Sequence, residues 1–249
     1  MKETNIYETD ELVSQYCDFQ YGDDYFGVEN FALTCAQKSI GYSKGTQQKK
    51  ALDLGCATGR ASFELTQSFD RVDGVDYSQA FIDAAEELQK NGQIRYAQNG
   101  EGDLKKQLLI DMTMYSFRDS CVKAQFFQGD ACALDPEFKD YDLIMATNLI
   151  DRLYQPQLFL TSIHERINHG GVLLLTSPYT WREEYTAKEF WIGGYKDENG
   201  NEVSTLEGLK KLLDENFELI ATEDIPFVIR ETSRKFQHTI SQMSVWRKR

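Results

Sequence analysis

The stretch KKALDLGCATGRASFEL, residues 49–65, decides the fold. An apolar run ends at Leu54, a loop with Gly55 and Gly59 follows, and helical spacing begins after it. Glycines at a strand-to-helix turn let the backbone approach a ligand closely, and the helix N-terminus offers free N–H groups. A glycine pair alone is weak evidence, because many such turns need a glycine for geometry. The spacing is GxxxG, which differs from the GxGxxG of a pyrophosphate-binding dinucleotide site.

Strand-like and helical runs alternate around this turn. Further strand-like runs are expected at 71–76, 124–129, 141–148 and 171–178, and helices at 60–69, 78–92 and 155–170, the last ending at His169-Gly170. Continuous apolar strands separated by helices favour a parallel sheet with helices on both faces. After a helix at 205–217, two long strands at 217–231 and 236–248 predict an antiparallel pair at one edge.

The length favours a single domain over residues 1–249, since α/β folds of this size are routinely single. Residues 1–48 precede the first strand and are expected to form an N-terminal helical cap over the site at the glycine turn. Residues 97–120 interrupt the third strand–helix unit and are expected to be an insertion.

Charge and cysteine content exclude several classes. The net charge is −13, which repels phosphate backbones and anionic lipid, so nucleic acid and membrane partners are not expected. Five cysteines without a CxxC pair argue against a disulfide framework or a zinc knuckle and fit a reducing cytoplasm. The start of the chain is polar and acidic, unlike a signal peptide, and no apolar run is long enough for a membrane span.

Acidic residues close the strands that follow the glycine turn. Asp76 ends the second strand, 21 residues after Gly55, where a carboxylate can accept both hydroxyls of a ribose. Asp130 follows the third strand, where it can reach an adenine amino group. Each acid by itself could be a solvated loop carboxylate. Because the tips of parallel strands lie side by side, we expect these carboxylates at one ligand site.

ALDLGCATG, GVDYS, QGDA and GGVLLLTSP resemble, in order, the four signature regions of class I S-adenosylmethionine-dependent methyltransferases. The resemblance covers roughly residues 49–180, with Ala57 in place of the middle glycine of the usual loop. It implies a Rossmann-like, mostly parallel sheet with an antiparallel C-terminal edge pair, and S-adenosylmethionine as cofactor. The cofactor-binding residues it implies are Tyr21, Asp53, Gly55, Cys56, Ala57, Gly59, Asp76, Tyr77, Asp130, Ala131 and Asn148.

A finer resemblance extends over most of the chain. NIYETDELVSQYCDFQYG, ATNLIDRLYQP, LTSPYTWREEYT, WIGGYKD and VIRETSRKFQHTISQMSVW are similar to the methyltransferase of ovothiol biosynthesis. That family methylates the imidazole of 4-mercaptohistidine, also called 5-thiohistidine, on the ring nitrogen nearer the side chain. It occurs alone or fused behind a sulfoxide synthase. The resemblance implies the standalone form, a thiolated histidine as substrate and functional coupling to a sulfoxide synthase.

The segment TSPYTWREEYTAKEFWIGGYKD, residues 176–197, holds six aromatic residues just after the fifth strand. We expect Tyr179 and Trp181 to form one wall for the imidazole, with Phe190 and Trp191 holding the loop down as a lid. The alternative is a satellite hydrophobic cluster without a ligand role, which is favoured for Tyr185, Phe190 and Trp191.

Other polar residues near strand ends are candidates for the acceptor. Asn148 can donate to or accept from the imidazole, or cap a turn. Asp151 and Arg152 would meet the substrate ammonium and carboxylate, or form a surface ion pair of little energy. Arg230 is the alternative carboxylate partner, since its fork is bidentate. Tyr7 would close over the site from the N-terminal cap.

His238 is expected on a strand, and together with Asn148 it is the candidate for catalysis. It could accept a proton that the ring sheds, although a lone histidine is more often structural. His164, His169 and His238 are scattered, so no metal site is expected. Two other functions stay open, namely methylation of another small metabolite and a cofactor-binding, non-catalytic interaction module.

Overall fold

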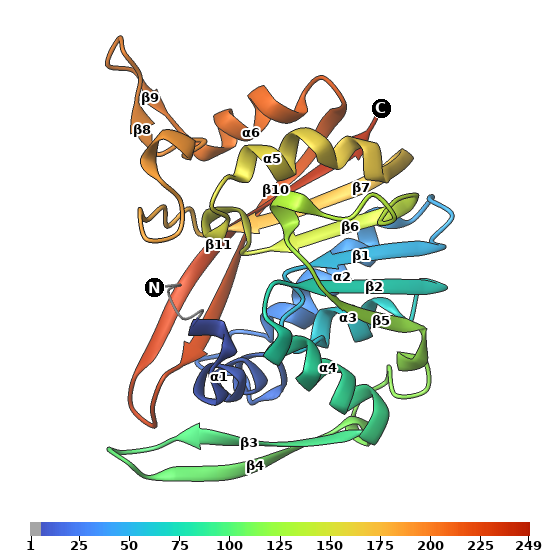
Figure 1. The fold of residues 1–249 in the computed structure, drawn as a ribbon, viewed down its shortest axis with the longest axis vertical. Coiled ribbons are helices and arrows are strands. Elements are labelled where there is room, and N and C mark those ends of the chain that lie inside the picture. The colour runs from blue at the N-terminus through green and yellow to red at the C-terminus, as the bar shows by residue number, and fades with distance from the viewer. Residues whose placement is uncertain (1–5) are drawn as a thin grey trace.

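The computed structural model describes residues 6–249, which form around a seven-stranded sheet of order β10-β11-β7-β6-β1-β2-β5 (Figure 1). The strands are β1 (Lys50–Leu54), β2 (Arg71–Asp76), β5 (Ala124–Gln128), β6 (Tyr141–Thr147), β7 (Ile167–Ser177), β10 (Phe217–Arg230) and β11 (Phe236–Lys248). The five strands from β7 to β5 in this order are parallel, and β11 runs antiparallel to both β7 and β10. The mostly parallel sheet with an antiparallel C-terminal pair is therefore confirmed.

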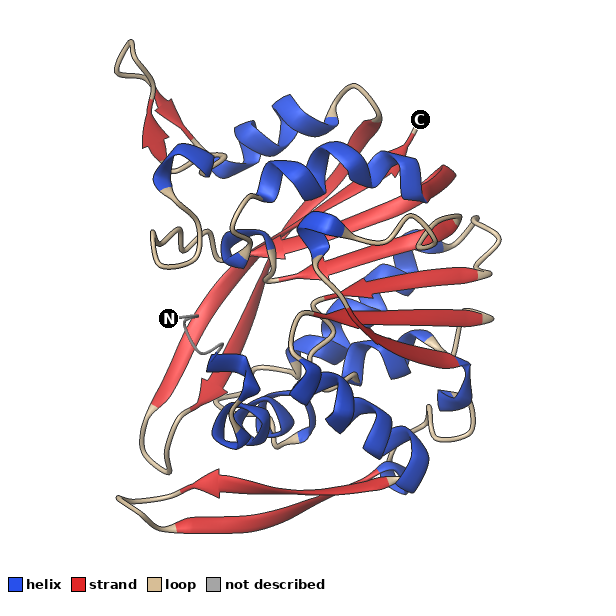
Figure 2. Ribbon diagram, viewed as in Figure 1, coloured by secondary structure: helices blue, strands red, loops and turns tan. Residues whose placement is uncertain are grey.

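Helices cover both faces of this sheet (Figure 2). On one face, α2 (Phe31–Ser43) and α3 (Arg60–Leu65) pack over Ala51, whereas α5 (Pro156–Ser162) and α6 (Thr205–Leu213) pack over Leu52 and Leu54 on the other. Successive side chains of a strand point to opposite faces, so this apolar run supplies both cores. Helix α4 (Gln79–Asn91) packs beside β5 in a third cluster.

A separate hairpin lies beside α1 (Asp10–Tyr21), away from the main sheet (Figure 2). Its strands are β3 (Gln93–Asn99) and β4 (Lys105–Asp111). The buried carboxylate of Asp18 on α1 accepts hydrogen bonds from Tyr96 Oη at 3.0 Å and from Gln98 Nε2 at 2.7 Å. The hairpin begins at Gln93, earlier than the predicted insertion, because α4 already ends at Asn91.

The predicted helix at 155–170 is wrong in its second half. Helix α5 ends at Ser162, a 3-10 turn covers Ile163–Arg166, and β7 begins at Ile167, so His169 lies on a strand. Gly170 has a φ of 77°, and the pairing of β6 with β7 shifts register nearby. The His-Gly pair that suggested a helix end thus marks an irregularity at the start of a strand.

Strands β10 and β11 run past the end of β7, since β11 pairs with β7 only over residues 242–247. We call residues 225–241 of this pair and its turn the C-terminal arm. Phe227 on the arm packs its ring against Phe19 of α1 and Phe31 of α2. The arm therefore extends beyond the carboxyl edge, meaning the side of the sheet where the parallel strands end. Within residues 6–249, no helix is long and apolar enough to cross a membrane.

Candidate functional site

The glycine loop connects β1 to α3 at the carboxyl edge. Gly55 and Gly59 have φ values of 76° and 86°, which side-chain-bearing residues rarely adopt. A Cβ on Gly59 would lie 2.9 Å from the ring of Phe126, so glycine is required there by packing as well. Ala57 adopts a φ of 46° in the same loop, and its backbone N–H donates to Asp76 Oδ2 at 2.9 Å.

Asp76 ties two elements together at the end of β2. Its Oδ2 accepts from Ala57 N in the glycine loop, and its Oδ1 accepts from Ser78 N, the N-cap of α4, at 2.9 Å. Burial raises the pKa of this carboxyl to about 6, although the backbone hydrogen bonds act in the opposite direction and lower it. A carboxylate has about four acceptor positions, so Asp76 can still accept from ribose hydroxyls.

Asp53 is buried on β1, just before the glycine loop. Its Oδ2 accepts from Ser62 Oγ at 2.7 Å, whereas its Oδ1 is buried without a hydrogen-bond partner among residues 6–249. Burial raises the pKa of Asp53 to about 7. An unpaired buried carboxylate oxygen is costly unless a donor or cation meets it. Together with the glycine cradle, this oxygen fits a cationic ligand such as S-adenosylmethionine.

Helix α1 holds the glycine loop from the side. Tyr21 Oη donates to Thr58 O at 2.8 Å, which makes Tyr21 a support of the loop. Gln20 Oε1 accepts from Thr58 Oγ1 at 2.7 Å, and Gln20 Nε2 donates to the carbonyl of Cys56. Gln20 was missed from the sequence, because a helix some 35 residues upstream gives no local sign of this contact. Cys56 is buried, and burial raises the pKa of its thiol.

The tip of β5 lies directly beside Asp76, because Asp76 pairs with Gln128. Asp130 follows in a turn, where its Oδ1 accepts from Cys132 N at 2.8 Å and its Oδ2 from Tyr154 Oη at 3.2 Å. The neighbouring Ala131 begins a short 3-10 helix. Tyr77, next to Asp76, is 64% exposed. The expected closeness of Asp76 and Asp130 at one edge is thus found.

Asn148 connects three elements at the tip of β6. It has a φ of 51°, and its backbone N–H donates to Thr176 O on β7 at 2.9 Å. Its Oδ1 accepts from Thr176 Oγ1 at 3.1 Å and from Ser241 Oγ on the C-terminal arm at 2.6 Å. The amide oxygen is therefore engaged, and the amide NH₂ is the group that Asn148 can offer to a ligand.

Asp151 and Arg152 form an ion pair, one of the two alternatives considered, but Asp151 is buried in it and only Arg152 reaches the surface. Asp151 is fully buried, and its Oδ2 accepts from Arg152 Nη1 at 2.8 Å, Thr180 Oγ1 at 2.8 Å and Thr180 N at 3.2 Å. The Arg152 side chain keeps 30% of its surface exposed. Its guanidinium carbon lies 4.8 Å from the ring centre of Tyr185. Asp151 therefore fixes Arg152 in place.

Tyr185 also lies near the N-terminal part of the chain. Tyr7, in the 3-10 turn η1 (Ile6–Glu8), packs edge-on against Phe81 of α4, and Tyr185 lies near enough to raise the pKa of its hydroxyl. Burial, and then Tyr185, raises the pKa of Tyr7 to about 12, and Arg152 and Asp76 are near enough to influence it. Ser78 donates to the carbonyl of Tyr7 at 2.7 Å and to Asp76, so the fold brings Tyr7 close to Asp76. Tyr185, for which a packing role was favoured, lies against Arg152.

The other aromatic residues after β7, in the aromatic loop (residues 178–191), mainly pack. Trp181 Nε1 donates to Thr205 Oγ1 at 2.9 Å, and its ring stacks on Trp191 with centroids 6.3 Å apart. Trp181 is thereby held against α6. This packing corresponds to the alternative role of the loop, a satellite hydrophobic cluster. Tyr179 has a φ of 55°, and its hydroxyl donates to Gln242 Oε1 on β11 at 2.9 Å. Burial and nearby Asp151 raise the pKa of Tyr179.

Arg230 and His238 lie on the C-terminal arm. Arg230 is at its far end, where its carbonyl accepts from Gln15 Nε2 of α1 at 3.5 Å. Phe236, its pairing partner, is five residues from Ser241, or roughly 17 Å along the strand. This separation places Arg230 away from Asn148, with which Ser241 forms a hydrogen bond. His238 is exposed and pairs with Val228, roughly 10 Å from Ser241 by the same measure.

A groove of about 550 Å³ lies elsewhere, between α2, α3 and residues 114–116. Arg60 and Glu64 in its lining bind each other at 2.8 Å, and Arg60 also lies over the ring of Tyr115. Their charges are satisfied within the protein. The candidate site therefore remains at the carboxyl edge, where the unpaired oxygen of Asp53 lies.

Comparison with known proteins agrees with this geometry. Residues 52–173 match the family model described as a methyltransferase domain. Among curated protein sequences, none matches this chain significantly. The magnesium protoporphyrin IX methyltransferase of Synechocystis PCC 6803, solved with bound S-adenosylmethionine, has a TM-score of 0.52 at 14% identity, covering 99% of this chain and 100% of that one. A putative methyltransferase from Bacillus halodurans C-125 gives 0.53 at 12% identity, covering 88% and 99%. The [4+2]-cyclase SpnF gives 0.55 at 16%, covering 87% and 76%.

The fold is that of the class I methyltransferases, and the domain match together with this fold supports a methyltransferase enzyme that uses S-adenosylmethionine as its cofactor. At such low identities, the structural likeness defines the fold and does not identify the methyl acceptor.

Proposed function

We propose that the enzyme methylates the imidazole of 4-mercaptohistidine on the ring nitrogen nearer the side chain, a step of ovothiol biosynthesis. The observation that carries the proposal is the Arg152 guanidinium, which buried Asp151 holds against the ring of Tyr185 and which stays partly exposed. A partly exposed cation that is fixed just after the tip of β6 suits the carboxylate of a small amino acid. The sequence motifs in these same segments support the thiolated histidine in particular.

The chain's own residues would hold the cofactor on the glycine loop. Gly55 and Gly59 keep the backbone free of side chains, Asp76 would accept from the ribose, and the unpaired Oδ1 of Asp53 would accept from a cationic group. S-adenosylmethionine supplies a methyl group on a sulfonium, which leaves S-adenosylhomocysteine after transfer. Asp130 lies at the neighbouring strand tip, where an adenine amino group would be expected.

The acceptor would lie between the aromatic loop and Asn148. Arg152 would bind its carboxylate, and the NH₂ of Asn148 would donate to the ring or its sulfur. The thiolate is a better nucleophile than the ring nitrogen, so orientation decides the product. Tyr7 remains a neutral donor at physiological pH because its pKa is about 12, and such a phenol can bind the thiolate away from the methyl group.

The transfer forms one N–C bond and breaks one S–C bond. A neutral ring with its sulfur as thiolate attacks with a nitrogen lone pair, and the product is then a neutral zwitterion with no proton to lose. A ring protonated at that nitrogen must first give the proton to a base. His238 is the candidate for that base, although it is exposed on the C-terminal arm.

The proposal is tested by incubating the purified enzyme and S-adenosylmethionine with 4-mercaptohistidine, and with histidine as control. The products are read by mass spectrometry and NMR. We expect a ring N-methyl product from the thiolated substrate only. An S-methyl product, or none while calorimetry still detects cofactor binding, would contradict the proposal and point to another small metabolite.

Arg152→Lys tests the carboxylate contact, because lysine keeps the charge beside Asp151 but loses the bidentate fork. The KM for 4-mercaptohistidine should rise roughly 10-fold or more, whereas cofactor affinity should hold. Arg182→Lys, at an exposed arginine of the aromatic loop, is the matched control. An analogue without the carboxylate should be equally poor with the wild-type enzyme and with Arg152→Lys. If Arg152→Lys raises the KM equally for 4-mercaptohistidine and for the analogue, Arg152 does not bind the carboxylate.

A further inference from the structure

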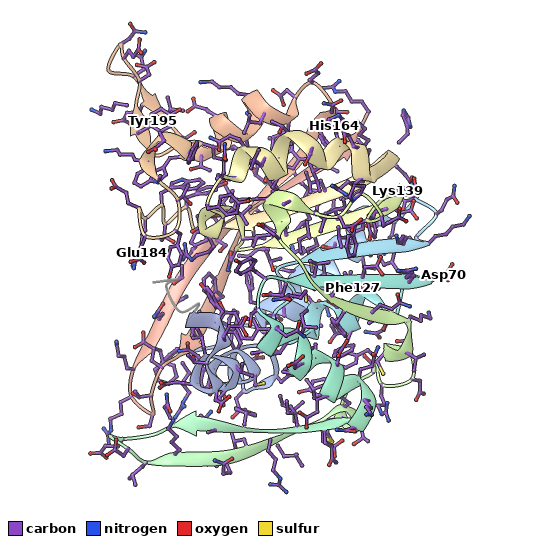
Figure 3. All side chains as sticks on the ribbon, in the orientation of Figure 1. Asp70, Phe127, Lys139, His164, Glu184 and Tyr195 are labelled. Carbon is purple, nitrogen blue, oxygen red and sulfur yellow. The ribbon has the colours of Figure 1, made fainter. Side chains whose placement is uncertain are left out.

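The side-chain amide of Asn148 is held by two hydroxyl groups from other strands. Its Oδ1 accepts from Ser241 Oγ on β11 at 2.6 Å and from Thr176 Oγ1 on β7 at 3.1 Å. Both hydroxyl residues are buried, whereas Asn148 is half-buried. Asn148 follows β6 at the carboxyl edge, at the end of the sheet where Figure 3 shows Glu184 of the aromatic loop and opposite to Asp70. The amide is thus held at the edge where the glycine loop lies.

The hydrogens of these two hydroxyls fix which way the amide faces. Thr176 Oγ1 accepts from the backbone N–H of Asn148 at 3.0 Å, so its own hydrogen is left to donate to the amide oxygen. A rotation of the amide by a half turn would put the NH₂ against both hydroxyls and leave their buried hydrogens without the acceptor that they now have, which is costly. Within residues 6–249, no acceptor meets the NH₂ of Asn148, so it is left for a ligand.

We propose that Ser241 and Thr176 are positioning residues that hold Asn148 as a hydrogen-bond donor toward the methyl acceptor, and that its NH₂ binds the acceptor's sulfur. The identity of the bound atom rests on the proposed function, whereas the hold on the amide does not. Ser241 belongs to the C-terminal arm, 93 residues after Asn148. The arm would thus help to decide which atom of the acceptor meets the methyl group.

The chemistry of the ring selects the sulfur among the possible partners of the NH₂. The attacking ring nitrogen has one lone pair in the ring plane, and this pair forms the N–C bond while the electrons of the S–C bond go to the cofactor sulfur. The other nitrogen of a neutral imidazole carries a hydrogen and is itself a donor. A thiolate has lone pairs for more than one donor, so it can accept from Asn148 as well as from Tyr7. A fixed N–H donor at the sulfur would hold it away from the methyl group.

Substitutions on β11 separate positioning from packing. Ser241→Ala removes one of the two donors to the amide oxygen, whereas Ser241→Thr keeps it. Ser244→Ala is the matched control, because Ser244 is equally buried on the same strand and its Oγ accepts from Trp246 Nε1 at 3.0 Å.

We expect Ser241→Ala to form some S-methyl product from 4-mercaptohistidine and to raise its KM roughly 2- to 10-fold, as the loss of one hydrogen bond predicts. Ser241→Thr and Ser244→Ala should form the N-methyl product only. The ratio of the two products, measured by NMR, does not depend on how much of the enzyme is folded, so a purely structural role would leave it unchanged. The Kd for S-adenosylhomocysteine should stay at the wild-type value.

NMR also tests the hold on the amide without any acceptor. In ¹⁵N-labelled enzyme with S-adenosylhomocysteine bound, the NH₂ signals of Asn148 are identified by their absence in Asn148→Asp. We expect one sharp pair of signals in wild type and in Ser244→Ala. In Ser241→Ala the pair should be broadened or doubled, because the amide can then rotate more easily.

An unchanged Asn148 signal in Ser241→Ala would overturn the positioning role, whatever the acceptor is. A changed signal with an unchanged product ratio would overturn the contact with sulfur. So would a Kd for S-adenosylhomocysteine that rises as much as the acceptor KM, because the NH₂ would then face the cofactor. If wild type methylates no thiolated histidine but the Asn148 signal changes as expected, the positioning role stands and the proposed function is wrong.

Discussion

Asp76 links the glycine loop to α4 through its two carboxylate oxygens. Asp76→Ala removes both backbone contacts and the acceptor for the ribose. We expect the Kd for S-adenosylmethionine to rise roughly 10- to 100-fold, the range for a hydrogen-bonded charge. Asp76→Asn, which keeps one acceptor oxygen, should lose less. Calorimetry measures this, with the exposed Asp83→Asn on α4 as control. Unchanged affinity in Asp76→Ala would remove Asp76 from the ribose site.

The pKa of Asp53, raised to about 7 by burial, predicts a pH dependence. Without cofactor, this raised pKa favours the neutral form in the folded protein. Its contribution to stability is full below the ordinary carboxyl pKa near 4 and is lost as pH rises through about 7. The affinity for a cationic cofactor depends on pH in the opposite direction and increases as pH rises, because the cation favours the carboxylate form of Asp53.

We therefore expect the affinity for S-adenosylmethionine to be about tenfold weaker at pH 5.5 than at pH 7.5. Calorimetry at both values measures it. In Asp53→Asn the affinity should depend less on pH, and the remaining dependence should come from Asp76, whose pKa is about 6. An equally steep dependence in Asp53→Asn would show that another group is responsible.

Residues whose role follows from local chain order could be predicted. Gly55 and Asp76 lie at strand ends that an apolar pattern defines, and they meet at the carboxyl edge as expected. Gln20 and Tyr185 could not be predicted, because their contacts depend on how α1 and the aromatic loop pack in three dimensions. The contacts of Trp181 with Thr205 and Trp191 could not be predicted either, since a position near a strand tip does not decide which way a ring points.

The β3–β4 hairpin braces α1, and α1 in turn holds the glycine loop. Tyr96→Phe removes one of the two donors to the buried carboxylate of Asp18. We expect a loss of about 1–3 kcal/mol in the free energy of unfolding. Cofactor affinity should also weaken, because Gln20 and Tyr21 are on the same helix as Asp18.

Urea denaturation and calorimetry on the same samples measure both effects. Gln107→Ala, at an exposed position of the same hairpin, is the control and should change neither quantity appreciably. A destabilised Tyr96→Phe enzyme with wild-type affinity would show that the hairpin supports the fold without supporting the site.

Sequence pattern located whole elements better than their ends. Apolar runs gave the strands of the main sheet, because burial on both faces leaves a continuous signal. The predicted strand starts later than β7 itself, which begins at Ile167. The polar residues Asn168 and His169 at its start resemble the end of a helix. The hairpin was predicted only as an insertion, because a two-stranded ribbon on a helix has weak alternation.

The site is assembled from distant parts of the molecule: η1, the glycine loop, the strand tips, the aromatic loop and the C-terminal arm. A ligand that contacts several of them binds the folded state only, so it should stabilise the whole chain. S-adenosylhomocysteine at 100 times its Kd adds about 2.7 kcal/mol, which should raise the Tm by about 5–10 °C for a chain of this size. Scanning calorimetry over a ligand series measures the shift. Asp76→Ala should need a proportionally higher ligand concentration for the same rise. A Tm that does not respond to ligand, in a protein that binds it by titration, would show that these parts do not unfold together.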